Sequence, residues 1–244
     1  MPRESHQRLT ARPLIITPDP LPHLEGSAII ETGQTKVLCA VSLERSVPKW
    51  MAGRGSGWLT AEYSLMPGST VPRARRERSG KISGRTQEIQ RLIGRSLRSA
   101  FRLDRLGENT LHIDCDVLCA DGGTRTAAIS GAYVAAALAV KRMIGRGEIQ
   151  DDVFLHPVAA ISVGVVGGEV TVDLNYEEDS SADVDMNVVL SKDGGFVEIQ
   201  GTGERTTYSR KELNAMLDGA EYAAKSIFAA QLAAIDAGLS VRSN

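Results

Sequence analysis

Two short segments of the chain each place an arginine at the expected start of a helix, close behind one or two glycines. They are Ser83-Gly84-Arg85-Thr86 and Gly122-Gly123-Thr124-Arg125. The free N–H groups and positive dipole end of a helix N-terminus suit an anion, and glycine lets the backbone approach closely. A threonine hydroxyl adds a donor, and the arginine fork matches phosphate geometry. Taken singly, each segment is weak evidence, because glycines also serve ordinary loops and surface arginines are common; two such helix starts that converge would make a phosphate pocket.

A third segment, residues 176–185, concentrates carboxylates between two expected strands. Its acidic residues are Glu177, Glu178, Asp179, Asp183 and Asp185. Oxygen ligands of this kind suit a hard divalent cation, and magnesium usually takes one or two carboxylates with waters and substrate phosphates. The alternative is an exposed acidic turn, which is the simpler interpretation of this segment in isolation.

The formal net charge of −2 conceals an uneven distribution. Between residues 73 and 105, ten arginines and one lysine are set against three carboxylates, a local charge of +8 that leaves −10 for the rest of the chain. Such a basic segment indicates an anionic partner, although a solvated arginine-rich helix face has the same charge. Its co-occurrence with two phosphate-binding helix starts and an acidic loop favours phosphoryl transfer on RNA.

These residues need a scaffold, and the hydrophobic pattern predicts one. The expected strands cover about 26–31, 35–42, 58–63, 110–119, 160–166, 169–176, 186–191 and 196–200. The expected helices cover about 85–103 and 124–144, with a last one from Ser209, where Glu212 completes a capping box. Residues 67–84 are expected to form a loop. Strands followed by helices, twice over, predict a single α+β domain, 1–244, with pseudo-duplicated halves of about 8–145 and 155–238.

Composition narrows the class of protein. With 244 residues, 42% hydrophobic and 24% charged, the chain is typical of a soluble globular protein with a sizeable core. Its most apolar run, residues 133–140, is too short to span a bilayer, and the N-terminal residues lack the apolar core of a signal peptide. Three cysteines without a Cys-x-x-Cys pair favour neither a disulfide framework nor a zinc site. We therefore expect a cytoplasmic protein with no membrane partner.

Longer segments of the chain resemble the ribonuclease PH family. The resemblance runs in unbroken order from about residue 8 to 230, and agreement of several long segments is far more specific than a lone glycine motif. The segments that carry it are 31–39, 57–63, 83–95, 114–129, 178–179, 183–187 and 198–202.

This resemblance implies the ribonuclease PH fold (ribosomal protein S5 domain 2-like), with two related halves of sheet and packed helices, assembled as a homohexamer that is a trimer of dimers. It also implies a nucleotidyltransferase that acts as a phosphate-dependent 3′→5′ exoribonuclease. Orthophosphate would attack the terminal 3′ phosphodiester and release a nucleoside diphosphate. The implied substrates are 3′ extensions of transfer-RNA precursors and other structured RNA, ribosomal RNA included.

The resemblance also implies site residues. Family members hold phosphate at the positions that match Arg85, Gly123, Thr124 and Arg125, which the helix-start argument selects independently. The matching acidic pair, Asp179 and Asp185, is associated with catalysis and with Mg²⁺. Asp114 and Asp116 are expected to support the site from beneath.

RNA contacts are expected in the arginine-rich segment. Family members contact the transfer-RNA body through the loop that contains Arg73, Arg75, Arg76 and Arg78, and Arg91 and Arg95 on the following helix are further candidates. The loop departs from the family pattern, because it is one residue shorter and Gly68 stands where an arginine is frequent. This departure bears on the preference for transfer RNA and leaves the phosphate site unchanged.

Three other functions compete with phosphorolysis. A hydrolytic, metal-dependent exonuclease explains the acidic and basic segments but needs no phosphate-binding helix starts. A non-catalytic RNA-binding ring subunit of the same superfamily typically loses the phosphate arginines or the acidic pair, and this chain keeps both. A general nucleic-acid-binding module fits poorly with an aromatic content of 5%, because such modules stack bases on aromatic side chains.

Overall fold

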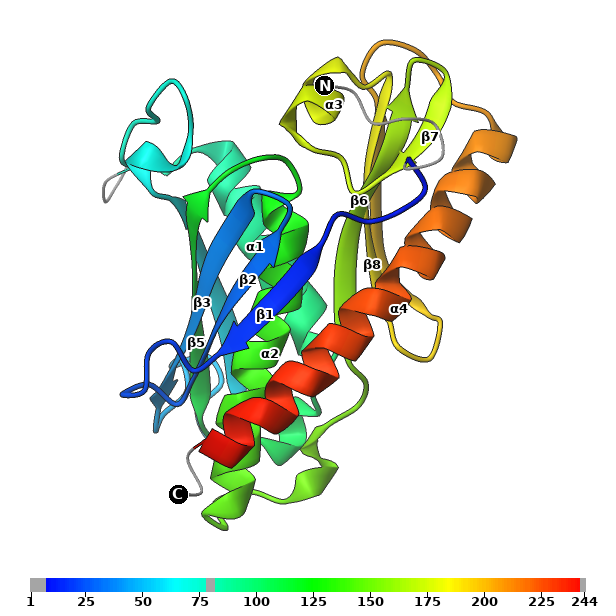
Figure 1. Ribbon diagram of the computed structural model, residues 1–244. Helices are drawn as coiled ribbons and strands as arrows, with labels where there is room; N and C mark the ends of the chain where they lie inside the picture. Colours follow the sequence, from blue (N-terminus) through cyan, green and yellow to red (C-terminus); the bar gives the residue numbers. More distant parts are fainter. Residues whose placement is uncertain (1–7, 78–81, 242–244) are drawn as a thin grey trace.

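The computed structural model of the chain describes residues 8–77 and 82–241 and has the predicted α+β architecture. Two sheets stand side by side with helices packed between and beside them (Figure 1). The strands are β1 (Leu14–Pro18), β2 (Gly26–Thr32), β3 (Thr35–Glu44), β4 (Trp58–Leu65), β5 (Thr110–Cys119), β6 (Val158–Val166), β7 (Glu169–Val172), β8 (Val184–Ser191) and β9 (Phe196–Gly203). The α-helices are α1 (Gly84–Arg98), α2 (Thr124–Gly145), α3 (Tyr176–Ser181) and α4 (Arg210–Val241), and short 3₁₀ turns lie at Pro67–Ser69, Leu103–Arg105 and Asp151–Val153.

The first sheet has the order β1-β2-β3-β5-β4. All neighbouring strands are antiparallel except β4 and β5, which run parallel. Parallel neighbours end at the same edge of a sheet, so the segments that leave β4 and β5 start from one edge. Helix α1 follows β4 and helix α2 follows β5, and this topology therefore brings the starts of the two helices to the same side of the molecule.

The second sheet has the order β7-β6-β8-β9 and is antiparallel throughout. One face of it packs against α4 through a separate apolar cluster that includes Val163, Val188 and Met216. Two tight hairpins build this sheet, and the first of them turns at Gly167-Gly168, as its glycine pair predicts.

Helix α2 lies between the two sheets and is apolar on all sides. Every residue from 126 to 140 is buried, as expected of a helix covered all round. Small residues let the first sheet come close: a Cβ added to Gly131 would lie 2.7 Å from Ile30 Cγ2. By length and composition α2 could also cross a membrane, but 83% of its most apolar stretch is buried inside the fold, which is typical of a core helix.

The segment before β1 runs from the second sheet to the first. The carbonyl of Arg8 accepts a hydrogen bond from Val172 N at 2.7 Å in β7, and the Arg8 guanidinium lies 3.2 Å from Glu169. Five residues later, the carbonyl of Pro13 accepts one from Gly33 N at 3.0 Å in the β2–β3 turn. This N-terminal segment, residues 8–13, therefore ties the two sheets together.

Several elements differ from the sequence-based expectation. Strand β1 was not expected, because its five residues show no clear pattern of their own. Helix α1 ends at Arg98 and not near 103, and the expected strand 169–176 ends at Val172. Asp114 and Asp116 lie on the exposed face of β5, so the expectation that they support the site from beneath is wrong.

Candidate active site

A cavity of about 630 Å³ opens where the starts of α1 and α2 face α3 and β8. It gathers cationic, acidic and hydroxyl side chains from both halves of the chain. Its lining includes Tyr63, Thr70, Val71, Pro72, Arg85, Thr86, Gly122, Gly123, Thr124, Arg125, Tyr176, Asp179, Asp185, Asn187 and Glu204. All six residues predicted for phosphate and catalysis thus lie in one place, although they span a hundred positions of sequence.

Helix α1 brings Arg85 and Thr86 to the cavity in its first turn. The helix starts at Gly84 because the Ser83 hydroxyl caps it, accepting a hydrogen bond from Thr86 N at 3.1 Å. No acidic residue occupies this first turn, so the positive end of the helix and the arginine act together on the cavity. The predicted helix start is confirmed.

Helix α2 starts at Thr124 after two glycines in the left-handed conformation, with φ of 72° at Gly122 and 63° at Gly123. Neither position tolerates a side chain easily. A Cβ on Gly122 would lie 2.4 Å from the carbonyl oxygen of Leu174, because the turn packs directly against the backbone that leads into α3. Residues 121–125 form the turn that is predicted to bind phosphate (the phosphate-binding turn). The two glycines let this turn touch the second half of the chain.

Tyr63 orients the hydroxyl of Thr124. The buried Tyr63 donates a hydrogen bond from its hydroxyl to Thr124 Oγ1 at 2.8 Å. Burial raises the pKa of Tyr63, while the bond to Thr124 and the charges of Arg85 and Arg125 act in the opposite direction. Because Thr124 Oγ1 already accepts this bond, its own proton is free to be donated to an anion in the cavity.

We expect Tyr63→Phe to raise the KM for orthophosphate by roughly three- to tenfold, the effect of losing one neutral hydrogen bond. The KM for RNA should change less than twofold, since the hydroxyl acts through Thr124. Steady-state kinetics with each substrate varied in turn would measure both. Tyr133→Phe, at a buried tyrosine of α2 stacked on Phe101, is the matched control and should leave both constants unchanged.

The two predicted catalytic carboxylates come from α3 and β8. The acidic segment is not the loop that was expected: residues 176–181 form a short helix with a capping box between Asn175 and Glu178. This helix directs Asp179 into the cavity, and Asp185 enters it from β8, where it pairs with Gly164 and Thr202 of the neighbouring strands. Asn187, two residues on in the same strand, lies on the same side.

The charges of the cavity act on both carboxylates. Burial raises the pKa of Asp179, Glu204 adds to the rise, and Arg85 and Arg125 oppose it. Burial, with Asp179 and Glu204, raises the pKa of Asp185 to about 6, again opposed by Arg125 and Arg85. The fold therefore holds two carboxylates close together at some cost in stability, which is a frequent sign of a functional site.

This cost gives a pH-dependent prediction for the metal-free protein. In the unfolded chain the pKa of Asp185 returns to roughly 4, so the unfolded state loses this proton first and the folded state is destabilised as pH rises from about 4 to 6. Asp185→Asn should remove this effect and stabilise the protein by about 2 kcal/mol at pH 7.5, and by less than half as much at pH 4.5. Urea unfolding in the presence of a chelator measures the free energy of unfolding at both pH values. An equal gain in stability at both would contradict the raised pKa of Asp185.

The donor set fits magnesium better than a metal with an all-protein ligand shell. No group of three or more His, Cys, Asp or Glu side chains able to hold a metal occurs among residues 8–77 and 82–241. Within the same residues, no donor hydrogen-bonds either carboxylate, so both keep free oxygen ligands. Magnesium commonly takes one or two protein carboxylates beside waters and substrate phosphates, and the two neighbouring helix starts that are predicted to hold phosphate suit that arrangement.

The candidate RNA-binding arginines that the structure describes do not line the cavity. Arg73, Arg75 and Arg76 are exposed on the segment that continues from its rim at Val71 and Pro72, while Arg78 falls outside the described residues. Arg91 is exposed on α1. Arg95 contacts Glu198 of β9 at 2.6 Å, so it also holds the two halves together.

Tyr63, Tyr176 and Glu204 are among the cavity residues that the sequence argument missed. Tyr63 reads as one more apolar position of an alternating strand, and Tyr176 and Glu204 stand in polar turns without a motif. Only the spatial meeting of β4, α3 and the end of β9 shows that they share a cavity. The position of Tyr63 opposite Cys115 in the parallel β4–β5 pair places it beside the start of α2.

Comparison with known proteins shows the class of enzyme to which this fold and cavity belong. The chain belongs to the 3′ exoribonuclease family: residues 10–141 match its domain 1 and residues 156–222 match its domain 2.

Within that family the type is ribonuclease PH. The chain is 58% identical over 211 residues to the ribonuclease PH of Corynebacterium glutamicum (strain R), covering 86% of each chain. It is 54% identical over 228 residues to that of Mycolicibacterium smegmatis, covering 93% of this chain and 88% of the relative. The predicted enzyme class, a phosphorolytic 3′ exoribonuclease that uses phosphate as co-substrate, is confirmed, and the non-catalytic ring subunit is the weaker alternative.

Solved structures show the same fold at lower identity. Rice (Oryza sativa) Rrp46 matches with a TM-score of 0.76 at 21% identity, covering 94% of this chain and 97% of that one. The Archaeoglobus fulgidus exosome with RNA bound to its active site matches with a TM-score of 0.75 at 22% identity, covering 90% and 88%. The predicted ribonuclease PH fold is thereby confirmed.

Proposed function

We propose that this chain trims 3′ extensions of transfer-RNA precursors, and of other structured RNA, one nucleotide at a time. An oxygen of orthophosphate attacks the phosphorus of the last 3′–5′ linkage, the bond from that phosphorus to the 3′ oxygen breaks, and a nucleoside diphosphate leaves. The observation that carries this proposal is the meeting of two arginine-bearing helix starts and two carboxylates in one cavity.

The helix starts have the role of holding orthophosphate. Arg85 and Arg125 supply guanidinium forks, Thr124 supplies an oriented hydroxyl, and the turn at Gly123 supplies backbone N–H groups. Together they offset part of the repulsion between two anions and fix the attacking oxygen in line with the scissile bond.

The carboxylates face the departing oxygen. Asp179 and Asp185 would hold Mg²⁺, which when bound supplies charge stabilisation to the phosphoryl oxygens. The departing 3′ oxygen must also gain a proton. A carboxylate that binds Mg²⁺ is deprotonated. Asp185 can therefore supply this proton only in an arrangement where Asp179 alone holds the metal, and there burial and the charge of Asp179 raise the pKa of Asp185 to about 6.

The exposed arginines beside the cavity have the role of positioning the RNA body. Simultaneous Arg73→Ala, Arg75→Ala and Arg76→Ala substitutions should raise the KM for a 3′-extended transfer RNA several-fold and lower the salt dependence of binding by about one unit of slope per lost phosphate contact. A short single-stranded oligonucleotide should be degraded as before. Alanine at Arg210, Lys211 and Lys225 of α4 removes equal charge elsewhere; if it has the same effect, the loop has no special role.

Product analysis tests the function itself. A 3′-extended transfer RNA is incubated with the protein and magnesium, with and without orthophosphate. Nucleoside diphosphates that form only with phosphate support phosphorolysis. Monophosphates without added phosphate would indicate hydrolysis, and RNA binding without products would favour the non-catalytic ring subunit.

Assembly and compartment complete the proposal. Exposed apolar side chains on the edge strand β9 (Phe196, Ile199) and on α4 (Tyr222) support contact with other copies of the chain, because an edge strand of this kind invites pairing. The proposed number of copies, six, is the one that the family resemblance implies. Light scattering should give the mass of six chains. A cytoplasmic location is proposed on the sequence, whose three cysteines include no Cys-x-x-Cys pair and favour no disulfide framework.

A further inference from the structure

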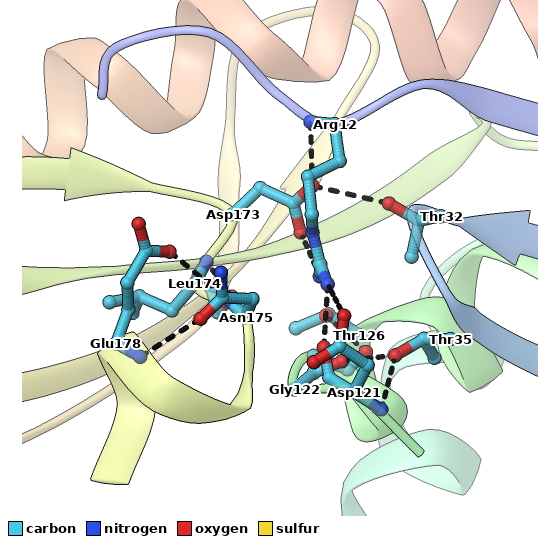
Figure 2. Close-up of polar contacts among 12 residues, drawn as sticks. Arg12, Thr32, Thr35, Asp121, Gly122, Thr126, Asp173, Leu174, Asn175 and Glu178 are labelled. Carbon is cyan, nitrogen blue, oxygen red and sulfur yellow. Dashed lines mark hydrogen bonds and ion pairs between the residues drawn. The ribbon is translucent and has the colours of Figure 1, made fainter. Parts of the chain in front are cut away.

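Behind the cavity, an arginine from the N-terminal segment makes a buried ion pair with an aspartate of the second half (Figure 2). Arg12 donates to Asp173 Oδ1 from its Nη2 at 2.7 Å, and to Oδ2 from its Nε at 3.0 Å and its backbone N at 2.9 Å. Thr32 of β2 donates to the same oxygen at 3.1 Å. The two charged side chains are only 8% and 6% exposed.

The same arginine reaches the phosphate-binding turn. Arg12 Nη1 donates to the carbonyl oxygen of Asp121 at 2.5 Å, and a Cβ on Gly123 would lie 3.2 Å from Arg12 Nη2. Thr35 of β3 holds the other side of the turn, donating to the carbonyl of Gly122 at 2.6 Å. Figure 2 shows the Arg12 side chain extending from Asp173 to this turn.

Asp173 is also placed to position α3. It lies two residues before Asn175, which caps that helix, and α3 is linked back to the turn because Tyr176 N donates to Asp121 Oδ1 at 3.2 Å. The contacts therefore run from the turn through Arg12 to Asp173 and into α3, and return to the turn through Asp121. A void of only about 20 Å³ adjoins the pair, too small for any ligand beyond a single water.

We propose that Arg12 and Asp173 are positioning residues that hold the phosphate-binding turn and the Asp179-bearing helix α3 at a fixed separation. This inference rests on the proposed function, since it assigns the two parts held apart to phosphate and to catalysis. Neither residue lines the cavity among the described residues, so both act through the groups they hold. Burial lowers the pKa of Arg12, but the hydrogen bond and charge of Asp173 outweigh it and raise that pKa, so the guanidinium stays charged.

The chain contains a matched control pair. Arg142 and Asp19 form a second buried ion pair, with side chains 11% and 6% exposed, and Asp19 has the same left-handed φ of 55° as Asp173. This pair lies near the far end of α2, about 25 Å from the phosphate-binding turn by the rise of the helix. Replacing one member of either pair leaves the other charge buried without its partner. Of the two pairs, the Arg12–Asp173 pair is the one that contacts the phosphate-binding turn.

The experiment compares Arg12→Met, Arg12→Lys and Asp173→Asn with Arg142→Met and Asp19→Asn. Hydrogen exchange of peptides that cover residues 120–126 and 174–181 is measured first, because it needs no activity. We expect exchange in both peptides to rise at least tenfold in Arg12→Met and Asp173→Asn, and less than twofold in the control variants at similar loss of thermal stability. Arg12→Lys keeps the positive charge but not the bidentate guanidinium, so its exchange rate should lie between those of the unaltered protein and Arg12→Met.

Kinetics provide the second readout. The KM for orthophosphate should rise at least tenfold in Arg12→Met and Asp173→Asn, while the KM for RNA changes less than threefold. Equal effects of the two pairs on exchange and on KM would overturn the proposal and leave Arg12–Asp173 as a stabilising pair alone. If the unaltered protein produces no nucleoside diphosphates, the proposed function fails, and the exchange comparison still decides whether the pair positions the turn. If Arg12→Met does not fold, the same comparison of exchange and KM is made with Asp173→Asn and Arg12→Lys.

Discussion

Replacement of Arg125 by alanine is expected to lower kcat/KM for orthophosphate by about 10²–10³-fold. Arg125 stands in the first turn of α2, where its guanidinium adds to the positive end of a buried helix. Its charge reaches both Asp179 and Asp185, since it opposes the rise in the pKa of each. Its loss therefore removes a phosphate ligand and also leaves two neighbouring carboxylates less compensated.

Initial rates at varied phosphate, with RNA saturating, measure this effect. Arg125→Lys should recover only part of the activity, because a point charge cannot replace a bidentate fork. Arg105→Ala removes an exposed arginine away from the cavity and serves as the control. Full activity of Arg125→Ala at ordinary phosphate concentrations would place the phosphate site elsewhere.

Asp179→Asn is expected to lower kcat by about 10³-fold while the binding of RNA is kept or strengthened. Removing one negative charge from the cavity reduces its repulsion of a polyanion, so a loss of affinity cannot account for the loss of rate. Single-turnover degradation and a separate filter-binding measurement distinguish the two quantities.

Glu177→Gln is the matched control for this substitution. Glu177 lies on the same short helix, is exposed and does not line the cavity. Both variants neutralise one carboxylate at nearly constant size. If they slow the reaction equally, the general charge of α3 matters and Asp179 has no special place.

The local parts of the site were predictable, and their meeting was not. A few adjacent residues determine where α1 and α2 start. Helix α1 starts after a serine cap, and α2 starts after two left-handed glycines, at a threonine. Hydrophobic periodicity gave most of the strands for the same local reason. Convergence of the two helix starts depends on β4 and β5 being parallel neighbours, and no residue pattern states which strands pair.

The acidic segment shows a second limit. A helix of six residues is below the length at which helical periodicity can be recognised, so residues 176–181 were expected as a loop. Its capping box, Asn175 with Glu178, was the available local signal. The Arg12–Asp173 pair could not be foreseen at all, because its members are 161 residues apart and an arginine near a chain end is usually a solvated one.

The parallel pairing of β4 and β5 also governs how the site responds to heat. Both helix starts are anchored to adjacent strands of one ladder, and slipping that ladder by one residue would turn every core side chain of the slipped strand outward. Even a small displacement of one helix start relative to the other therefore costs considerable free energy. Arg85 and Arg125 keep their spacing until the first sheet itself gives way, so activity should be lost over the same narrow temperature interval as the fold and not fade gradually before it.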